Sequence, residues 1–130
     1  MKKIISTLLV CVLLIGCVAV LAACGAPSSD PKEAKANLEE EGYTVELREN
    51  VEGYAATLYA YKNNVNQKKF DEIYIYYFKD SAAANKAWET MEDAFAKEAE
   101  PTKDTDYEIE YGIDDKLIYK GTLDAVSAAK

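Results

Sequence analysis

The sequence contains no histidine, and its only three cysteines, Cys11, Cys17 and Cys24, lie near the N-terminus of the 130-residue chain. Without histidine, the chain lacks the commonest general base and the commonest metal ligand of proteins. Without cysteine after residue 24, the rest of the chain can form neither a disulfide nor a thiolate zinc site. A domain in that part must therefore depend on its hydrophobic core for stability.

Basic residues are also in the minority. The chain has 15 lysines and arginines against 23 aspartates and glutamates, which gives a net charge of −8 at pH 7. An acidic chain is repelled by nucleic acids and by anionic lipid headgroups, so we expect no nucleic-acid partner and no basic patch for membrane attachment. The simplest role of the negative charge is to keep the domain soluble.

The N-terminal segment has the pattern of an export signal. Lys2 and Lys3 precede an apolar run from Ile4 to Val20, and small residues follow before Cys24. The string Leu21-Ala22-Ala23-Cys24 resembles the lipobox of the bacterial lipoprotein class. That resemblance implies a signal peptide at 1–23, a diacylglycerol on Cys24, and a protein on the outer side of the cytoplasmic membrane. Residues 24–30 would then form a lipidated tether, and residues 31–130 a single domain.

Two alternatives remain for this segment. Leu14-Ile15-Gly16-Cys17 also matches the lipobox pattern, but cleavage there would leave an apolar stub at the new N-terminus. The uncharged stretch from Ile4 to Ala26 is also long enough to span a bilayer without cleavage. Cleavage before Cys24 leaves a small, polar tether and removes Lys2 and Lys3, so that 13 basic and 23 acidic residues give a net charge of −10.

Hydrophobic periodicity predicts eight elements after the tether. Asp30 and Pro31 begin a short helix that ends before Gly42. Runs that alternate in polarity, or that are rich in β-branched and aromatic residues, predict strands at 43–48, 54–61, 71–79, 107–111 and 116–120. Apolar residues at helical spacing predict two more helices, one from Asp80 or Ser81 to Glu98 and one from Thr122 onward. The order α-β-β-β-α-β-β-α predicts an α+β domain in which an antiparallel sheet of about five strands carries helices on one face.

The long helix carries an apolar stripe that includes Trp88, Met91 and Phe95. We interpret these residues as core. Trp88 lies at the centre of the stripe, so we expect it to be largely buried against Ile73, Ile75 or the final hairpin.

Motifs for catalysis and cofactors are absent from the sequence. The chain has no glycine-rich nucleotide loop, and its serines after the tether lie where no nucleophile motif surrounds them. We therefore expect neither an enzyme nor a bound cofactor.

One acidic segment needs a separate interpretation. Asp104, Asp106, Glu108 and Glu110 recur at every second position, a spacing found in calcium loops, and Asp115 lies further on. Ile109 stands where such a loop needs glycine, however, so we favour a solvated strand edge whose charges discourage edge pairing, with no metal bound.

Tyrosine is abundant, with ten residues in the chain. Strand alternation places Tyr59 and Tyr61 on one face of the second strand, and Tyr74 and Tyr76 on one face of the third. If the helices cover the other face, these four rings form a partly exposed contact surface, because tyrosine combines apolar area with a polar tip. The alternative is that tyrosine simply suits half-buried strands.

These observations favour a membrane-anchored interaction or accessory lipoprotein that contacts a protein or another envelope component. A small-ligand-binding lipoprotein is the alternative. The strings Leu38-x-x-x-Gly42-Tyr43 and Tyr77-Phe78-Lys79-Asp80 resemble small lipoproteins of unknown function from anaerobic Gram-positive bacteria, and this resemblance implies no functional residues.

Overall fold

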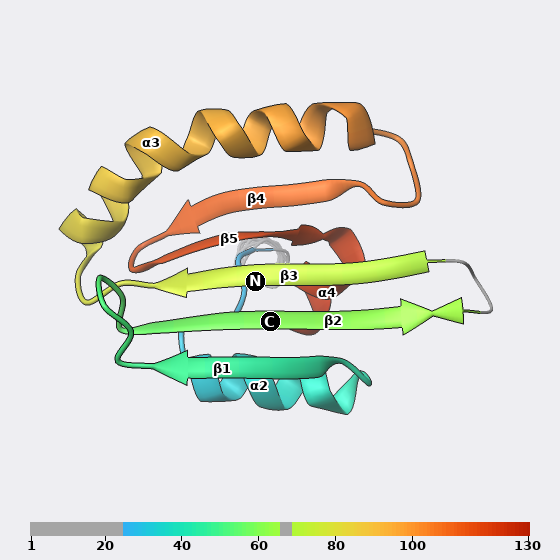
Figure 1. The fold of residues 1–130 in the computed structure, drawn as a ribbon, viewed down its shortest axis with the longest axis horizontal. Helices are drawn as coiled ribbons and strands as arrows, with labels where there is room; N and C mark the ends of the chain where they lie inside the picture. The colour runs from blue at the N-terminus through green and yellow to red at the C-terminus, as the bar shows by residue number, and fades with distance from the viewer. Residues whose placement is uncertain (1–24, 66–68) are drawn as a thin grey trace, which may run out of the picture.

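Three α-helices and five β-strands make up the part of the chain that the computed structural model describes, residues 25–65 and 69–130. Along the chain they are α2 (Pro31–Glu40), β1 (Thr44–Glu49), β2 (Ala56–Asn64), β3 (Lys69–Tyr77), α3 (Ser81–Ala99), β4 (Ile109–Asp114), β5 (Leu117–Thr122) and α4 (Leu123–Ala128), and a short 3-10 helix, η2 (Glu100–Thr102), follows α3. The order of helices and strands and the five-stranded antiparallel sheet confirm the predicted α+β class (Figure 1).

The strands lie in the order β1-β2-β3-β5-β4, and each neighbouring pair is antiparallel. β2 and β3 form the central hairpin, in which Tyr59 lies opposite Tyr74 and Leu58 opposite Ile75. This hairpin is longer than the strands predicted at 54–61 and 71–79, because the pairing continues to Asn64 and Lys69. β1 and β4 form the two edges of the sheet.

Local capping explains where the helices begin. The Asp30 side chain accepts a hydrogen bond from the Lys32 amide at 2.9 Å, as predicted for the start of α2. Asp80 caps α3 by accepting from the Ala83 amide at 2.7 Å. After α2, Gly42 adopts a φ of +88°, a backbone conformation that glycine tolerates, and the chain turns into β1.

One face of the sheet is closed by α2 and α4, and both helices lie behind the sheet in Figure 1. The core on this face includes Leu38 of α2, Leu58 of β2, Ile73 and Ile75 of β3, Leu117 of β5 and Val126 of α4, each at most 2% exposed. We refer to it as the helix-covered face. Its aliphatic side chains alternate along β2 and β3 with the tyrosines, as the sequence pattern predicts.

The third helix requires a correction to the expectation that all helices lie on one face. Phe95 of α3 packs in a second cluster with Ile118 of β5, whereas the neighbouring Leu117 belongs to the first cluster. Because successive residues of a strand point to opposite faces, α3 lies on the face away from α2 and α4. In Figure 1 it runs alongside β4, and it therefore covers only one margin of that face.

Trp88 also differs from the expectation. It is only partly buried, and its ring contacts Phe95 and Tyr111, with centroids 6.3 Å and 6.2 Å away. Contact with the final hairpin is thus confirmed through Tyr111 of β4. Trp88 does not pack against Ile73 or Ile75, the other two predicted neighbours, because those side chains lie on the helix-covered face.

The segment before α2 is attached to the domain. The Ser28 amide donates to the Ala129 carbonyl at 2.9 Å, and the Tyr77 hydroxyl donates to the Ser28 carbonyl at 2.9 Å. Ala26 packs against the core of the helix-covered face. The chain therefore joins the domain on that face.

Candidate functional site

The four tyrosines singled out from the sequence lie together on the face opposite α2 and α4. Tyr59 and Tyr74 are directly opposite each other on β2 and β3, and their ring centroids are 4.6 Å apart. Tyr61 lies one alternate position along β2 from Tyr59, at 5.8 Å between centroids. Tyr76 occupies the next position of the same parity on β3. We call this surface the tyrosine face.

Further aromatic rings extend the tyrosine face at both ends. Phe70 stacks beside Tyr61 with centroids 6.1 Å apart. At the other end, Tyr54 lies 5.6 Å from Tyr76 and 5.2 Å from Phe78. The rings thus form two groups along the central hairpin, one around Tyr59 and one around Tyr54.

The tyrosine face is partly open to solvent. Tyr61 is 39% exposed, and Tyr59, Tyr74 and Tyr76 have intermediate exposure. Tyr76 packs against the cluster under α3, so it also stabilises the fold. The predicted exposure of this face is confirmed, and the open part centres on Tyr59, Tyr61 and Tyr74.

Charged side chains surround the rings. The Tyr59 hydroxyl donates to Glu72 at 3.1 Å, and burial together with this carboxylate raises the pKa of Tyr59 to about 12. Arg48 is paired with Glu46 on β1. Lys120 of β5 lies 5.3 Å from the Tyr74 ring centroid.

Two shallow hollows make the tyrosine face uneven. One, of about 220 Å³, lies between β1 and the rings of Tyr59, Tyr74 and Tyr76. The other, of about 230 Å³, lies between Tyr74 and the segment that contains Tyr107 and Ile109. Both are lined mostly by ring and aliphatic carbon, as a contact surface for a partner's side chains would be.

Sequence reasoning missed Phe70, Tyr54 and Lys120. The alternation Phe70, Glu72, Tyr74, Tyr76 along β3 was a signal that could have found Phe70. No comparable signal exists for Lys120, because its place opposite Tyr74 depends on the pairing of β3 with β5, which are far apart in sequence.

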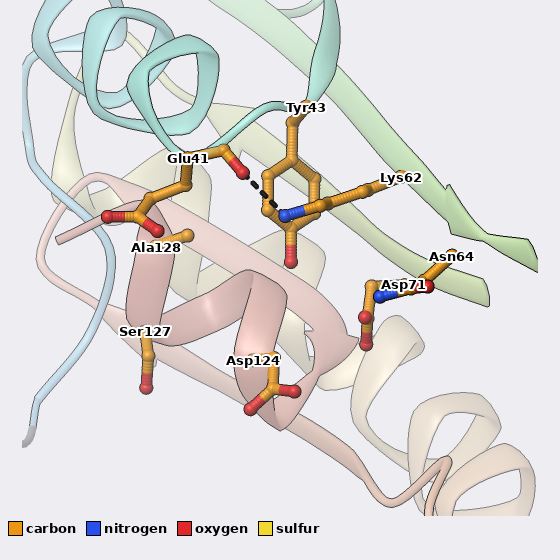
Figure 2. A pocket seen from close by; sticks show the side chains of 8 residues that line it. All are labelled: Glu41, Tyr43, Lys62, Asn64, Asp71, Asp124, Ser127 and Ala128. Atoms are coloured by element: carbon orange, nitrogen blue, oxygen red, sulfur yellow. Dashed lines mark hydrogen bonds between the residues drawn. The ribbon is translucent and has the colours of Figure 1, made fainter. Parts of the chain in front are cut away.

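A separate pocket of about 400 Å³ lies between α2, α4 and the neighbouring ends of β2 and β3 (Figure 2). Its polar lining includes Glu41, Tyr43, Lys62, Asn64, Asp71 and Asp124. Asp71 is only 6% exposed, accepts a hydrogen bond from the Thr122 hydroxyl at 2.8 Å, and lies 3.6 Å from Lys69 Nζ. Nothing in the sequence predicted this pocket.

Two other predicted features lie elsewhere. Cys24 and the signal segment fall outside the described residues. The acidic residues 104–115 belong to the loop before β4, to β4 itself and to the following turn. Within residues 25–65 and 69–130, no group of three or more acidic side chains is arranged to bind a metal ion.

No family model, curated protein or solved structure matches this chain. In the part of the chain that the structure describes, none of the helices is long and apolar enough to cross a membrane.

Proposed function

We propose that this chain is a non-catalytic lipoprotein, anchored through Cys24 on the outer side of the cytoplasmic membrane, whose tyrosine face binds a protein partner. The observation that carries the proposal is the run of tyrosine rings on β2 and β3, outside the cover of α2 and α4. Clustered exposed aromatic rings exceed what solubility requires, and tyrosine is enriched at the centres of protein interfaces.

The charges around the rings favour a partner with arginine or lysine among apolar groups. Among the described residues, no lysine or arginine lies within ion-pair distance of Glu72, which accepts only the Tyr59 hydroxyl. The exposed tyrosine rings beside it offer cation–π contacts to a basic side chain. The acidic net charge of the chain also attracts a basic partner at long range.

The attachment of the N-terminal segment is consistent with this role. Ser28 and Ala26 contact the helix-covered face, so a lipid on Cys24 would hold that side of the domain next to the membrane. The tyrosine face lies on the opposite side of the sheet and would then face away from the membrane.

The anchor is tested with Cys24→Ala in a bacterial host, using membrane fractionation and incorporation of labelled fatty acid. We expect the variant to lose the label and to leave the membrane fraction or to accumulate as precursor. Cys17→Ala is the matched control and should remain lipidated. The reverse result would move the anchor to Cys17, and a membrane-bound but unlabelled wild-type chain would indicate an uncleaved span.

The contact surface is tested with the double variant Tyr61→Ser/Tyr74→Ser. Both rings lie on the open part of the face, whereas Tyr76 packs against Tyr54 and would report folding as well as binding. We expect at least tenfold less cross-linked partner after capture from envelope membranes.

The matched control is Leu123→Ser, which removes a 44% exposed apolar side chain from α4. It should leave partner recovery unchanged. Circular dichroism must show both variants folded, and equal recovery by the two variants would contradict the assignment of the tyrosines as a contact surface.

A further inference from the structure

We propose that the pocket between α2, α4 and the β2–β3 hairpin binds the primary ammonium group of a small molecule. This site lies on the helix-covered side, away from the tyrosine face, so the inference goes beyond the proposed function and does not depend on it.

The pocket has the volume of a small-molecule site. Its volume of about 400 Å³ lies within the range of about 300–1,000 Å³ common for small-molecule sites. Its lining comes from segments far apart in sequence: the residues after α2, the end of β2, the start of β3, and α4. The pocket therefore forms only when the domain is folded and these segments are packed together.

Tyr43 supplies the observation that points to a ligand. Its side chain extends from the start of β1 into the pocket, and the hydroxyl is directed towards the space beside Asp71 and Asp124 (Figure 2). The residue is only 7% exposed, yet its hydroxyl has no hydrogen-bond partner within residues 25–65 and 69–130. None of the buried side-chain nitrogen and oxygen atoms of the described residues lacks a hydrogen-bond partner, so this unpaired hydroxyl is the part of Tyr43 that reaches the open space of the pocket. It is therefore available to bond a molecule that enters there.

The charges of the pocket favour a cation. Three carboxylates, Glu41, Asp71 and Asp124, face two lysines, Lys62 and Lys69, which leaves one net negative charge. Both lysines are already engaged. Lys62 donates to the Glu41 carbonyl at 2.7 Å, and Lys69 contacts both aspartates.

The same carboxylates affect Tyr43. Burial, followed by the charges of Asp71, Asp124 and Glu41, raises the pKa of the Tyr43 hydroxyl. The hydroxyl is therefore protonated at neutral pH, and it can accept a hydrogen bond from a ligand through its lone pairs.

An ammonium group fits this set of acceptors better than a metal ion or an anion does. It carries three N–H donors, and the pocket offers three acceptor groups: the Tyr43 hydroxyl and the carboxylates of Asp71 and Asp124. Glu41, Asp71 and Asp124 line the same pocket, but among the described residues no three acidic side chains are placed so that they could hold a metal ion together. An anion would be repelled by the net negative charge.

The binding experiment uses the ¹⁵N-labelled full chain in detergent, titrated with 1,4-diaminobutane at physiological salt. The neutral compound 1,4-butanediol has the same carbon chain and is the matched ligand control. We expect saturable shifts of the amide signals of Glu41, Tyr43, Ser127 and Ala128 with the diamine, and none with the diol. Equal shifts with both compounds, or unsaturable shifts spread over all acidic surfaces, would overturn the proposal.

Two variants test the residues. Tyr43→Phe keeps the ring and removes a hydroxyl that makes no hydrogen bond within the described chain, and Asp124→Asn removes one carboxylate charge. We expect each to weaken diamine binding at least fivefold. The control Asp93→Asn makes the same substitution at an exposed aspartate on α3 and should leave binding unchanged.

A further experiment distinguishes two sources of the ammonium group, a soluble amine and a lipid headgroup. Free ethanolamine is compared with vesicles containing phosphatidylethanolamine, with phosphatidylcholine vesicles as the control. Shifts with free ethanolamine assign the pocket to a soluble amine, and shifts with the ethanolamine vesicles alone assign it to a lipid headgroup. If neither these probes nor 1,4-diaminobutane shifts the pocket signals, the proposal is wrong.

Discussion

The two faces of the central hairpin are built from the same two strands and differ in almost every other respect. On the helix-covered face, β2 and β3 contribute Leu58, Ile73 and Ile75, which α2 and α4 seal from solvent. On the tyrosine face, the same strands contribute the alternating residues Tyr59, Tyr74 and Tyr76. There α3 covers only the margin near β4 and β5. The comparison shows that one face of the hairpin is sealed by helices, whereas the other is sealed only at its margin and stays partly open to solvent.

The largest effect should follow from a cavity on the helix-covered face. Ile75 is fully buried at the centre of the sheet, so Ile75→Ala should lower the free energy of unfolding by about 3 kcal/mol. Urea denaturation monitored by circular dichroism measures this loss. A cost below that of Tyr74→Ser, at the adjacent position on the other face, would contradict the comparison.

A smaller loss is expected at the margin covered by α3. Trp88→Ala removes a partly buried ring that contacts Phe95 and Tyr111, and it should cost about 2 kcal/mol, less than a fully buried aromatic residue. In the wild-type chain, iodide should partly quench the tryptophan fluorescence. Complete protection from iodide would mean that α3 covers more of the tyrosine face than we describe.

The titration of Tyr59 on the tyrosine face should make the stability of the fold depend on pH in the alkaline range. The pKa of Tyr59 is raised from 10.0 to about 12, first by burial and then by Glu72. Between these values the unfolded chain releases a proton that the folded chain retains, so the free energy of unfolding falls as the pH rises from 10 to 12.

Glu72→Gln tests the contribution of the carboxylate to this titration. The variant should lower the pKa of Tyr59 but leave it above 10, because the burial of the ring remains. NMR titration of the tyrosine ring carbons measures the change. An unchanged pKa would show that burial alone accounts for the shift.

The smallest effect is expected at the rim of the tyrosine face. Arg48→Ala breaks an exposed ion pair with Glu46, and such pairs contribute little, so stability should change by less than about 0.5 kcal/mol. Thermal unfolding measures it. A loss of more than 1 kcal/mol, at the high end for exposed pairs, would indicate that the rim contributes to the fold.

Local sequence patterns predicted much of this fold. The alternation along 73–78 correctly placed Ile73 and Ile75 on one face and Tyr74 and Tyr76 on the other, and Asp30 and Asp80 correctly marked two helix starts. The side taken by α3 could not be predicted, because the apolar stripe of Trp88 and Phe95 fits either face of a sheet.

The pocket was beyond prediction for a different reason. Lys69 contacts Asp124 of α4, a pair of residues 55 positions apart, and only the packing of α4 against β3 brings them together. The tyrosine face, by contrast, depends on alternation within two adjacent strands, and the sequence pattern was therefore sufficient to find it.

The hydrogen bonds at Ser28 have a consequence for how strongly the tyrosine face must bind. If Cys24 bears the lipid, the anchor lies four positions before Ser28, where Tyr77 bonds the chain, which gives a reach of at most roughly 14 Å. The domain would then be confined to a thin layer above the bilayer. A partner in the same layer would meet it at a high effective concentration, so an interface of modest intrinsic affinity would suffice for a persistent complex.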